Sequence, residues 1–160
     1  MDIKTVKIDI PEGLNIVIGQ SHFVKTAEDM YEILVGSSSH MKFGVAFSEA
    51  SGPCLVRYEG NDETLMKIAY EASLALSCGH TFVIFMKDGF PINVLNAVKM
   101  CQEVCHVICA TANPLEVIIA VGEEGNGILG VIDGARPKGV EKEEDKIGRK
   151  ELLRKFGYKL

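Results

Sequence analysis

The sequence contains no long apolar segment, and no run approaches the ~20 residues that a helix needs to span a bilayer. Residues 1–5 have no extended apolar core behind them, so no signal peptide is predicted. The net charge of −5 disfavours nucleic acids and anionic membrane surfaces as general partners, because both attract basic patches. These absences predict a cytoplasmic protein that binds neither nucleic acid nor membrane.

Paired C-x-x-C motifs are also absent, and the number of cysteines is odd, at five. This usage fits a reducing compartment. Cys101, Cys105 and Cys109 recur every four residues, but Cys101 is expected to end a helix and the other two to lie on a strand. Two strand positions four residues apart are separated by about 13 Å, too far for one zinc ion. We therefore interpret all five cysteines as small core residues.

The phosphate-binding loops of common kinases are missing as well. No G-x-x-x-x-G-K-[ST] motif occurs, and the glycines of residues 125–130 lead into an expected strand instead of a helix. They therefore do not match a dinucleotide-binding fingerprint. A conventional P-loop or protein-kinase mechanism has no support in this sequence.

The patterns that are present predict one domain of strands and helices. A chain of 160 residues can bury a sizeable core without disulfides. Residues 6–10 alternate as in a half-buried strand, whereas Ile16-Val17-Ile18 indicates a strand buried on both faces. Helices are expected from about 27 to 35, 61 to 78, 91 to 102, and within 141–157. Their expected caps are Thr26 with Asp29, Asn61, and Gly79.

A strand–helix–hairpin pattern occurs twice, over residues 15–60 and 81–122. The predicted fold is therefore of the α/β type (α+β), a single compact domain over residues 1–160 with a C-terminal helix. Each expected hairpin has a polar turn. We call residues 48–55 the first tip and residues 111–114 the second tip. Equivalent tips are expected to face each other, within a subunit or across a subunit contact.

The first tip contains Ser48, Glu49 and Ser51, with Arg57 on the strand that follows. Glu49 can coordinate Mg²⁺ or accept a hydrogen bond from a ribose hydroxyl, and Arg57 can bind a phosphate through two hydrogen bonds. The alternative is that this segment simply turns the chain, with Arg57 paired to Glu59 or to a helix carboxylate.

The second tip contains Thr111 and Asn113. The Asn113 amide both donates and accepts, which suits a nucleobase or ribose edge, although Asn-Pro is also an ordinary turn. Further along, Asp133 can bind a metal and Arg136 can contribute to a phosphate clamp. For both residues, simple solvation at the surface is the alternative.

Two of the four histidines, His22 and His80, follow or precede apolar strands. Strand ends border the ligand clefts of many α/β folds. Either residue can serve as a general base or accept a phosphoryl group, and a purely structural histidine is the alternative for each. His40 lies in a serine-rich loop and is expected to be exposed, whereas His106 lies in a strand and can point either way.

Several blocks together resemble one family. They are Gly19–Phe23, Phe43–Arg57, Pro91–Asn96, Ala110–Pro114, Gly130–Gly134 and the ending Gly157–Lys159. The chain resembles the adenosine-specific kinase family of archaeal and thermophilic bacterial proteins over nearly its whole length. Ser77-Cys78 before Gly79-His80 departs mildly from the family's pattern of smaller residues.

The resemblance implies an α/β-type domain that binds adenosine or AMP, ADP or ATP and assembles as a homotrimer or homohexamer. It implies phosphoryl transfer from ATP or another phosphate donor through a histidine, His22 or His80. We expect the remaining roles to fall on residues of the two tips and their flanks. Glu49, Ser51, Thr111 and Asn113 would contact ribose and base, Arg57 and Arg136 would neutralise phosphate, and Glu49 or Asp133 would hold Mg²⁺.

Two rival functions remain open at this point. Because no recognised kinase motif is present, a non-enzymatic, oligomeric nucleotide-binding or sensor protein is the first alternative. A purely structural assembly module is the second.

Overall fold

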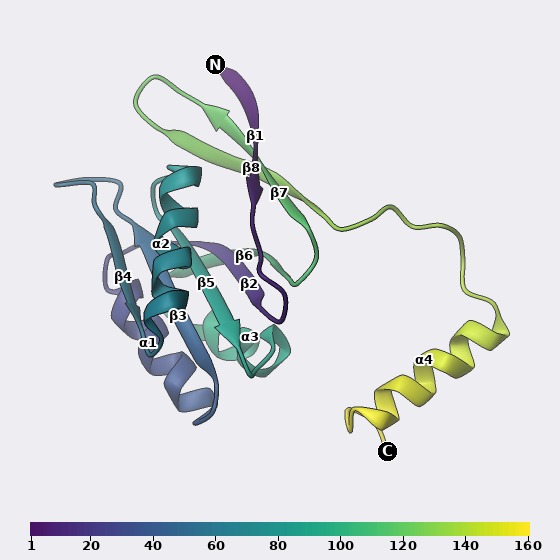
Figure 1. Cartoon of the computed structure of the whole chain (residues 1–160). Helices are drawn as coiled ribbons and strands as arrows, with labels where there is room; N and C mark the ends of the chain where they lie inside the picture. The colour runs from purple at the N-terminus through teal and green to yellow at the C-terminus, as the bar shows by residue number, and fades with distance from the viewer.

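The structure, a computed structural model, describes all 160 residues and contains four helices and two antiparallel sheets (Figure 1). It confirms the α+β class and the C-terminal helix. The elements in chain order are β1 (Asp2–Ile8), β2 (Asn15–Ser21), α1 (Thr26–Ser37), β3 (Lys42–Ser48), β4 (Val56–Gly60), α2 (Glu63–Leu76), β5 (Thr81–Lys87), α3 (Pro91–Met100), β6 (Val104–Thr111), β7 (Leu115–Val121), β8 (Asn126–Asp133) and α4 (Glu143–Lys155).

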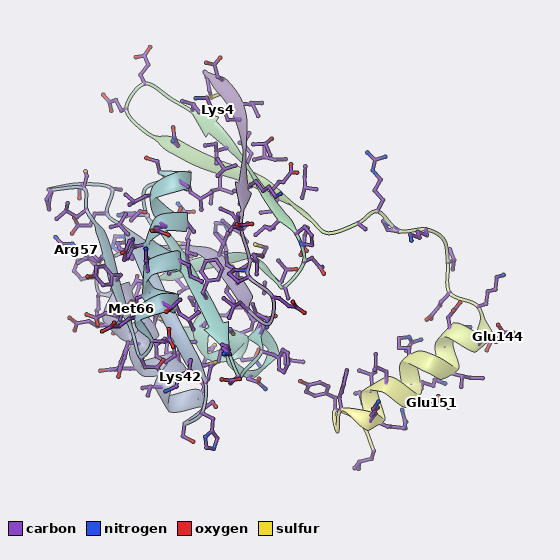
Figure 2. The ribbon with its side chains drawn as sticks, viewed as in Figure 1. Lys4, Lys42, Arg57, Met66, Glu144 and Glu151 are labelled. Atoms are coloured by element: carbon purple, nitrogen blue, oxygen red, sulfur yellow. The ribbon has the colours of Figure 1, made fainter.

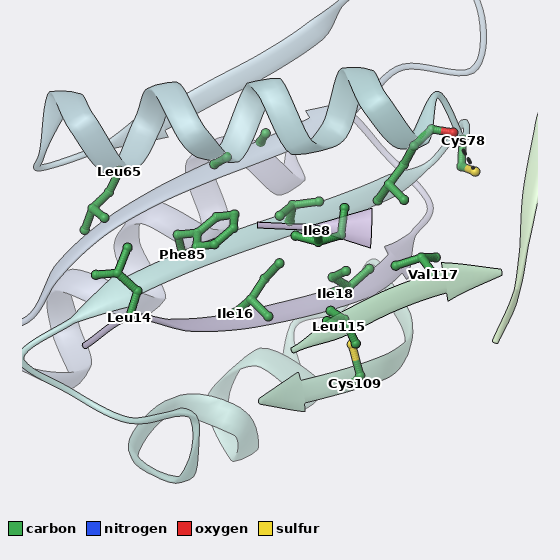
Figure 3. Packing of buried hydrophobic residues seen from close by; sticks show 14 of the residues in the cluster. Ile8, Leu14, Ile16, Ile18, Leu65, Cys78, Phe85, Cys109, Leu115 and Val117 are labelled. Carbon is green, nitrogen blue, oxygen red and sulfur yellow. Dashed lines mark hydrogen bonds between the residues drawn. The ribbon is translucent and has the colours of Figure 1, made fainter. Parts of the chain in front are cut away.

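A five-stranded sheet in the order β4-β3-β5-β2-β6 forms the centre of the fold. Ile16, Val17 and Ile18 of β2 are all 0% exposed, which confirms the prediction of a strand buried on both faces. One face packs against α1 and α3, and the other packs against α2 and a second sheet in the order β1-β7-β8 (Figure 3). Alternate residues of β2 therefore enter two separate hydrophobic clusters.

The approach of α2 to β3 depends on a glycine. A Cβ atom at Gly44 would lie 2.2 Å from the backbone carbonyl carbon of Leu65. No side chain fits there, so α2 packs directly on the strand backbone and brings Leu65 and Ala69 into the core. At the C-terminal end of α2, a hydrogen bond between the Ser73 and Ser48 hydroxyls holds the helix beside the first tip.

The predicted helix caps were wrong in detail. Asp62, not Asn61, caps α2 by accepting from Leu65 N, while the Asn61 side chain instead bonds the backbone of Phe43 and Met41. Thr26 makes no capping box, because its hydroxyl bonds Ser21 and Phe23.

The left-handed residue at the end of α2 is Ser77 and not Gly79. In contrast, α3 begins at Pro91 as predicted.

The second expected hairpin is not a hairpin. β6 pairs with β2 at the edge of the five-stranded sheet, whereas β7 pairs with β1 and β8 in the other sheet. The order strand–helix–strand–strand does recur, but only β3 and β4 pair with each other. The two tips therefore have different structural surroundings.

α4 lies away from the body of the molecule, at the end of an extended linker of residues 134–142 (Figures 1 and 2). None of its residues is buried. We call residues 134–160 the C-terminal arm. No helix of the chain has the length and apolar character needed to cross a membrane.

Candidate functional site

A cleft of about 620 Å³ lies at the end of the central sheet. Three connections form its walls: the first tip, the segment between α2 and β5, and the turn between β7 and β8. Its polar lining includes Gln20, Glu49, His80, Glu124 and Asn126. Most of the residues brought together here are distant in the sequence, so the fold assembles the cleft.

The backbone of His80 is fixed on both sides. Its N–H donates to the Ser48 carbonyl at 2.8 Å, and its carbonyl accepts from Ser21 N at 2.9 Å. His80 has a left-handed backbone with φ of 58°, a conformation that is uncommon for residues other than glycine but in which asparagine, aspartate and histidine are enriched. Nearby, the Ser48 and Ser73 hydroxyls share a buried hydrogen bond of 2.7 Å. The cleft floor is thus a rigid, hydrogen-bonded platform.

The two candidate histidines lie together. Their ring centroids are 6.3 Å apart in an edge-on arrangement, and the His80 ring stacks on Phe47 at 5.9 Å. His80 lines the cleft, whereas His22 is exposed beside it. The remaining histidines are His40, which is exposed as expected, and His106, which is exposed on β6.

Glu49 and Arg57 form an ion pair in which Arg57 Nε donates to Glu49 Oε1 at 2.9 Å. The other oxygen, Oε2, accepts from Leu55 N at 2.9 Å. The Leu55 hydrogen bond, followed by that of Arg57, holds the pKa of the Glu49 carboxyl below its usual value. Arg57 therefore pairs within the first tip and its strand, and not with Glu59 or a helix carboxylate.

A neighbouring groove of about 840 Å³ runs between the start of α1 and β4. It shares Glu49 with the cleft and adds Lys25 and Arg57. Figure 2 labels Arg57 on β4. Ser51 is exposed at the turn and lines neither the cleft nor the groove.

The second tip is closed on itself. Asp133 Oδ1 accepts from Thr111 Oγ1 at 2.7 Å and from Asn113 Nδ2 at 3.1 Å. The backbone N–H of Asn113 also donates to Thr111 Oγ1 at 3.0 Å. These three residues, predicted separately, form one cluster that connects the second tip to the end of β8.

The structure does not bring the two tips together within one chain. Thr111 pairs with Ile16 at one end of β2, whereas Ser48 follows Phe47, which lies level with Phe82 and Gly19 near the other end. A shift of four residues along a strand is about 13 Å, and three strand spacings add about 14 Å across the sheet. A ligand that touches both tips would need a second copy of the chain.

Two other predicted contributors lie outside the cleft. Arg136 is exposed on the linker that leads to α4, and Asp133 belongs to the second-tip cluster. Glu49 and Asp133 therefore do not converge on one metal ion. The positive charge of Arg57 lies beside Glu49, so it disfavours a cation at that carboxylate. Glu49 and Asp133 are therefore separate alternatives for Mg²⁺, and binding at either one stays a prediction.

Sequence reasoning missed Ser73 and Asn126. Ser73 is a buried polar residue on the otherwise apolar stripe of α2, which is a signal that could have identified it. The backbone of Asn126 forms an isolated β-bridge with that of Cys78, and its side-chain Nδ2 donates to the Leu76 carbonyl at 3.4 Å. No local pattern places a residue of the β7–β8 turn beside the end of α2.

The cysteines divide into two groups. Cys78 and Cys109 are buried as predicted and Cys101 is half-buried, but Cys54 and Cys105 are exposed, so the core interpretation was wrong for these two. Burial, the larger cause for each, raises the pKa of the Cys101 and Cys109 thiols to about 11. Neither is therefore a ready nucleophile near neutral pH.

Comparison with known proteins gives a consistent result. The profile of a family described as adenosine specific kinase matches residues 6–159. The crystal structure of the PH1918 protein from Pyrococcus horikoshii OT3 is similar with a TM-score of 0.95 and 40% sequence identity, covering 99% of this chain and 98% of that one. A comparison with curated proteins found no match.

Proposed function

Because the chain belongs to the adenosine-specific kinase family, we propose that it binds adenosine and adenine nucleotides and transfers a phosphoryl group through a histidine. The observation that carries the proposal is the pairing of His80, which lines the cleft, with His22 beside it, their ring centroids 6.3 Å apart. A phosphate donor such as ATP is implied by a kinase family.

The cleft offers groups that suit a nucleoside. Gln20 and Asn126 present amides that can donate and accept, and Ser48 and Ser73 present hydroxyls. Glu49 lies at the junction of the cleft and the neighbouring groove. In this proposal the adenosine occupies the cleft, with its 5′-hydroxyl directed toward the histidines.

The reaction proceeds in two balanced steps. A ring nitrogen of His80 or His22 attacks the terminal phosphorus of the donor. An N–P bond forms, and the P–O bond to the nucleoside diphosphate, which leaves, breaks. The 5′-oxygen of adenosine then attacks the same phosphorus, the N–P bond breaks, and the proton of the hydroxyl passes to the other histidine.

The phosphate groups need positive charge, which the cleft of one chain does not supply. No Lys or Arg is among its lining residues, and Glu49 and Glu124 make it acidic. Arg57 and Lys25 border the adjoining groove. We therefore place the donor phosphates toward that groove. There Arg57 can release its ion pair with Glu49 and bind a phosphate group instead.

The direct test incubates the purified protein with adenosine, γ-labelled ATP and Mg²⁺. Labelled AMP, together with an acid-labile label on the protein, supports a histidine carrier. Adenosine binding without turnover and without protein labelling would overturn the enzyme proposal.

Histidine variants then assign the roles. Asparagine suits the left-handed backbone at position 80, so His80→Asn should keep the hydrogen bonds to Ser48 and Ser21 while removing the imidazole. We expect His80→Asn and His22→Asn each to lower turnover by at least about 100-fold. His40→Asn, at an exposed residue near the opposite end of β3, is the matched control and should remain active.

A non-enzymatic nucleotide sensor is the second candidate, and the acidic lining of the cleft favours it. Glu49 and Glu124 would repel a nucleoside triphosphate more than adenosine itself. Calorimetric titration separates the two proposals. Tight binding of adenosine or AMP, with no turnover when ATP is added, would support the sensor.

We also propose that the protein is a homo-oligomer, a trimer or hexamer, joined through the C-terminal arm. An isolated helix of 13 residues is marginal in water, and no residue of α4 is buried against its own chain. Exposed Leu152 and Phe156 give it an apolar patch. The likeness to the PH1918 structure covers 99% of this chain, which includes the arm.

Light scattering coupled to size-exclusion chromatography tests the assembly. We expect the full chain to elute as a trimer or hexamer and a chain ending at Gly134 to elute as a smaller species. An unchanged mass after truncation would show that the arm is not the interface. The exposed thiols of Cys54 and Cys105 fit the proposed cytoplasmic location.

A further inference from the structure

A second cluster of polar residues lies on the opposite face of the central sheet, between α1 and the loop that follows α3. It consists of Asp29 on α1, Cys101 at the end of α3, and Glu103 just before β6. One ligand atom from each residue lies within 4.8 Å of the other two. None of the three lines the cleft or the neighbouring groove.

Glu103 makes this cluster unusual. The residue is only 6% exposed, and neither carboxylate oxygen has a hydrogen-bond partner. A buried carboxylate without a donor is costly, and here a second carboxylate, that of Asp29, is its neighbour. The protein groups around Glu103 therefore leave its oxygens unsatisfied.

We propose that Asp29, Cys101 and Glu103 bind a divalent cation, and that this cation is Zn²⁺. Zinc accepts thiolate and carboxylate ligands together, whereas Mg²⁺ and Ca²⁺ prefer oxygen alone. Three protein ligands leave a fourth position of a tetrahedral site for water. The cation neutralises both carboxylates and satisfies the Glu103 oxygens.

Two groups must give way for the cation to enter. The Cys101 thiol approaches Asp29 Oδ2 at 3.9 Å and loses its proton to solvent as the Zn–S bond forms. Lys25 forms an ion pair with Asp29, and its side chain is 45% exposed. It can therefore swing into water and release the carboxylate without disturbing the core.

The cluster is connected to the rest of the molecule through the backbone. The Glu103 carbonyl accepts a hydrogen bond of 2.8 Å from the His22 amide. A bound cation would therefore stabilise the loop that carries His22. The inference stands on the cluster itself and does not depend on the proposed phosphotransfer.

The test measures binding of metal ions to the full-length protein after treatment with a chelator. We expect one equivalent of Zn²⁺ to bind, to raise the Tm, and to be displaced by neither Mg²⁺ nor Ca²⁺. Co²⁺ should produce the near-ultraviolet absorption band of a thiolate ligand. Cys101→Ser should abolish this band, and both Cys101→Ser and Glu103→Gln should weaken Zn²⁺ binding by at least about tenfold.

Matched controls exclude other ligands. Cys54→Ser and Glu32→Gln alter exposed residues outside the cluster and should leave Zn²⁺ affinity and the Co²⁺ band unchanged. The double variant His22→Asn/His80→Asn tests the only nearby histidine pair and should also retain the band.

The rival explanation is a proton shared between Glu103 and Asp29. Gln mimics a protonated Glu, so on that explanation Glu103→Gln keeps its stability in the metal-free state and Zn²⁺ does not raise the Tm of the wild-type protein. That result, or a Co²⁺ spectrum without the thiolate band, overturns the proposal. If Cys101→Ser fails to fold, the wild-type Co²⁺ spectrum and the Glu103→Gln Tm series decide alone.

Discussion

The two tips contain similar residue types but differ in what their polar groups bond to. In the first tip, Glu49 accepts from Leu55 N and Arg57 Nε through its two oxygens, yet it still lines the cleft. In the second, Thr111 and Asn113 direct their side chains to Asp133 and line neither the cleft nor the groove. The path of the following strand makes the difference, since β4 returns beside β3 whereas β7 leaves for the other sheet. Polar turn residues thus line a cleft or connect two sheets according to the path of the strand that follows them.

The largest expected effect falls on the second tip. Asp133→Ala removes the acceptor shared by Thr111 and Asn113. It leaves the buried Thr111 hydroxyl without an acceptor for its proton. We expect a loss of about 2 kcal/mol in the free energy of unfolding, measured by urea denaturation, with adenosine affinity unchanged. A loss of affinity at normal stability would instead place the second tip at a ligand site completed by another subunit.

Glu49→Gln is expected to have the opposite effect, with a larger change in adenosine affinity than in stability. It keeps the size of the side chain but removes the charge that holds Arg57. Because the Arg57 side chain is 43% exposed and solvent screens the pair, we expect only a small loss of stability. Adenosine affinity, measured by calorimetry, should fall about tenfold if Glu49 contacts the ribose. Unchanged affinity would remove the first tip from the nucleoside site.

Gly79→Ala tests the geometry of the cleft wall. An added Cβ would lie 2.8 Å from the Cβ of Ala50, so the first tip must shift. We expect a threefold to tenfold loss of adenosine affinity, equivalent to about 1 kcal/mol. Gly127→Ala is the control, because a Cβ there meets nothing within 4 Å. Equal effects of the two substitutions would show that the first tip is free to move.

The smallest effect is a dependence on pH. The pKa of Glu49 is lowered from its ordinary value of 4.5, first by the Leu55 hydrogen bond and then by Arg57. A depressed folded-state pKa means that the contribution of Glu49 to stability is present above pH 4.5 and is lost as the pH falls through the lower, folded value. Below that pH, the hydrogen bond from Leu55 N to Glu49 weakens. The backbone amide of Leu55 should then lose protection against hydrogen exchange, measured as its exchange rate relative to the intrinsic rate at the same pH. Constant protection of Leu55 across this range would contradict the assigned hydrogen bond.

Much of the fold followed from local patterns. The apolar run of Ile16-Val17-Ile18 correctly indicated burial on both faces, and Pro91 correctly marked the start of α3, because burial pattern and proline geometry are properties of short segments. The pairing of β6 and β7 could not be read in the same way. A turn such as Asn113-Pro114 does not determine whether the next strand returns or crosses to another sheet.

The candidate site was predictable to the same limited extent. His22 and His80 were recognised as strand-end residues, and only β2 and β5 pairing side by side brings them together. The cluster of Asp29, Cys101 and Glu103 was missed, because it joins α1 to residues more than seventy positions later, as the Cys101–Asp29 contact shows. Contacts of that range depend on helix packing, which no local pattern encodes.

A row of backbone hydrogen bonds crosses the end of the central sheet. It runs from the Ser48 carbonyl to His80 N, from the His80 carbonyl to Ser21 N, and from His22 N to the Glu103 carbonyl. In thermodynamic terms, the row joins the cleft proposed to bind a nucleoside to the cluster proposed to bind a cation. If occupation of one site changes the affinity of the other, linkage requires the same factor in both directions. The strength of this coupling can therefore be obtained from either ligand alone, by titrating it with the other site empty and then filled.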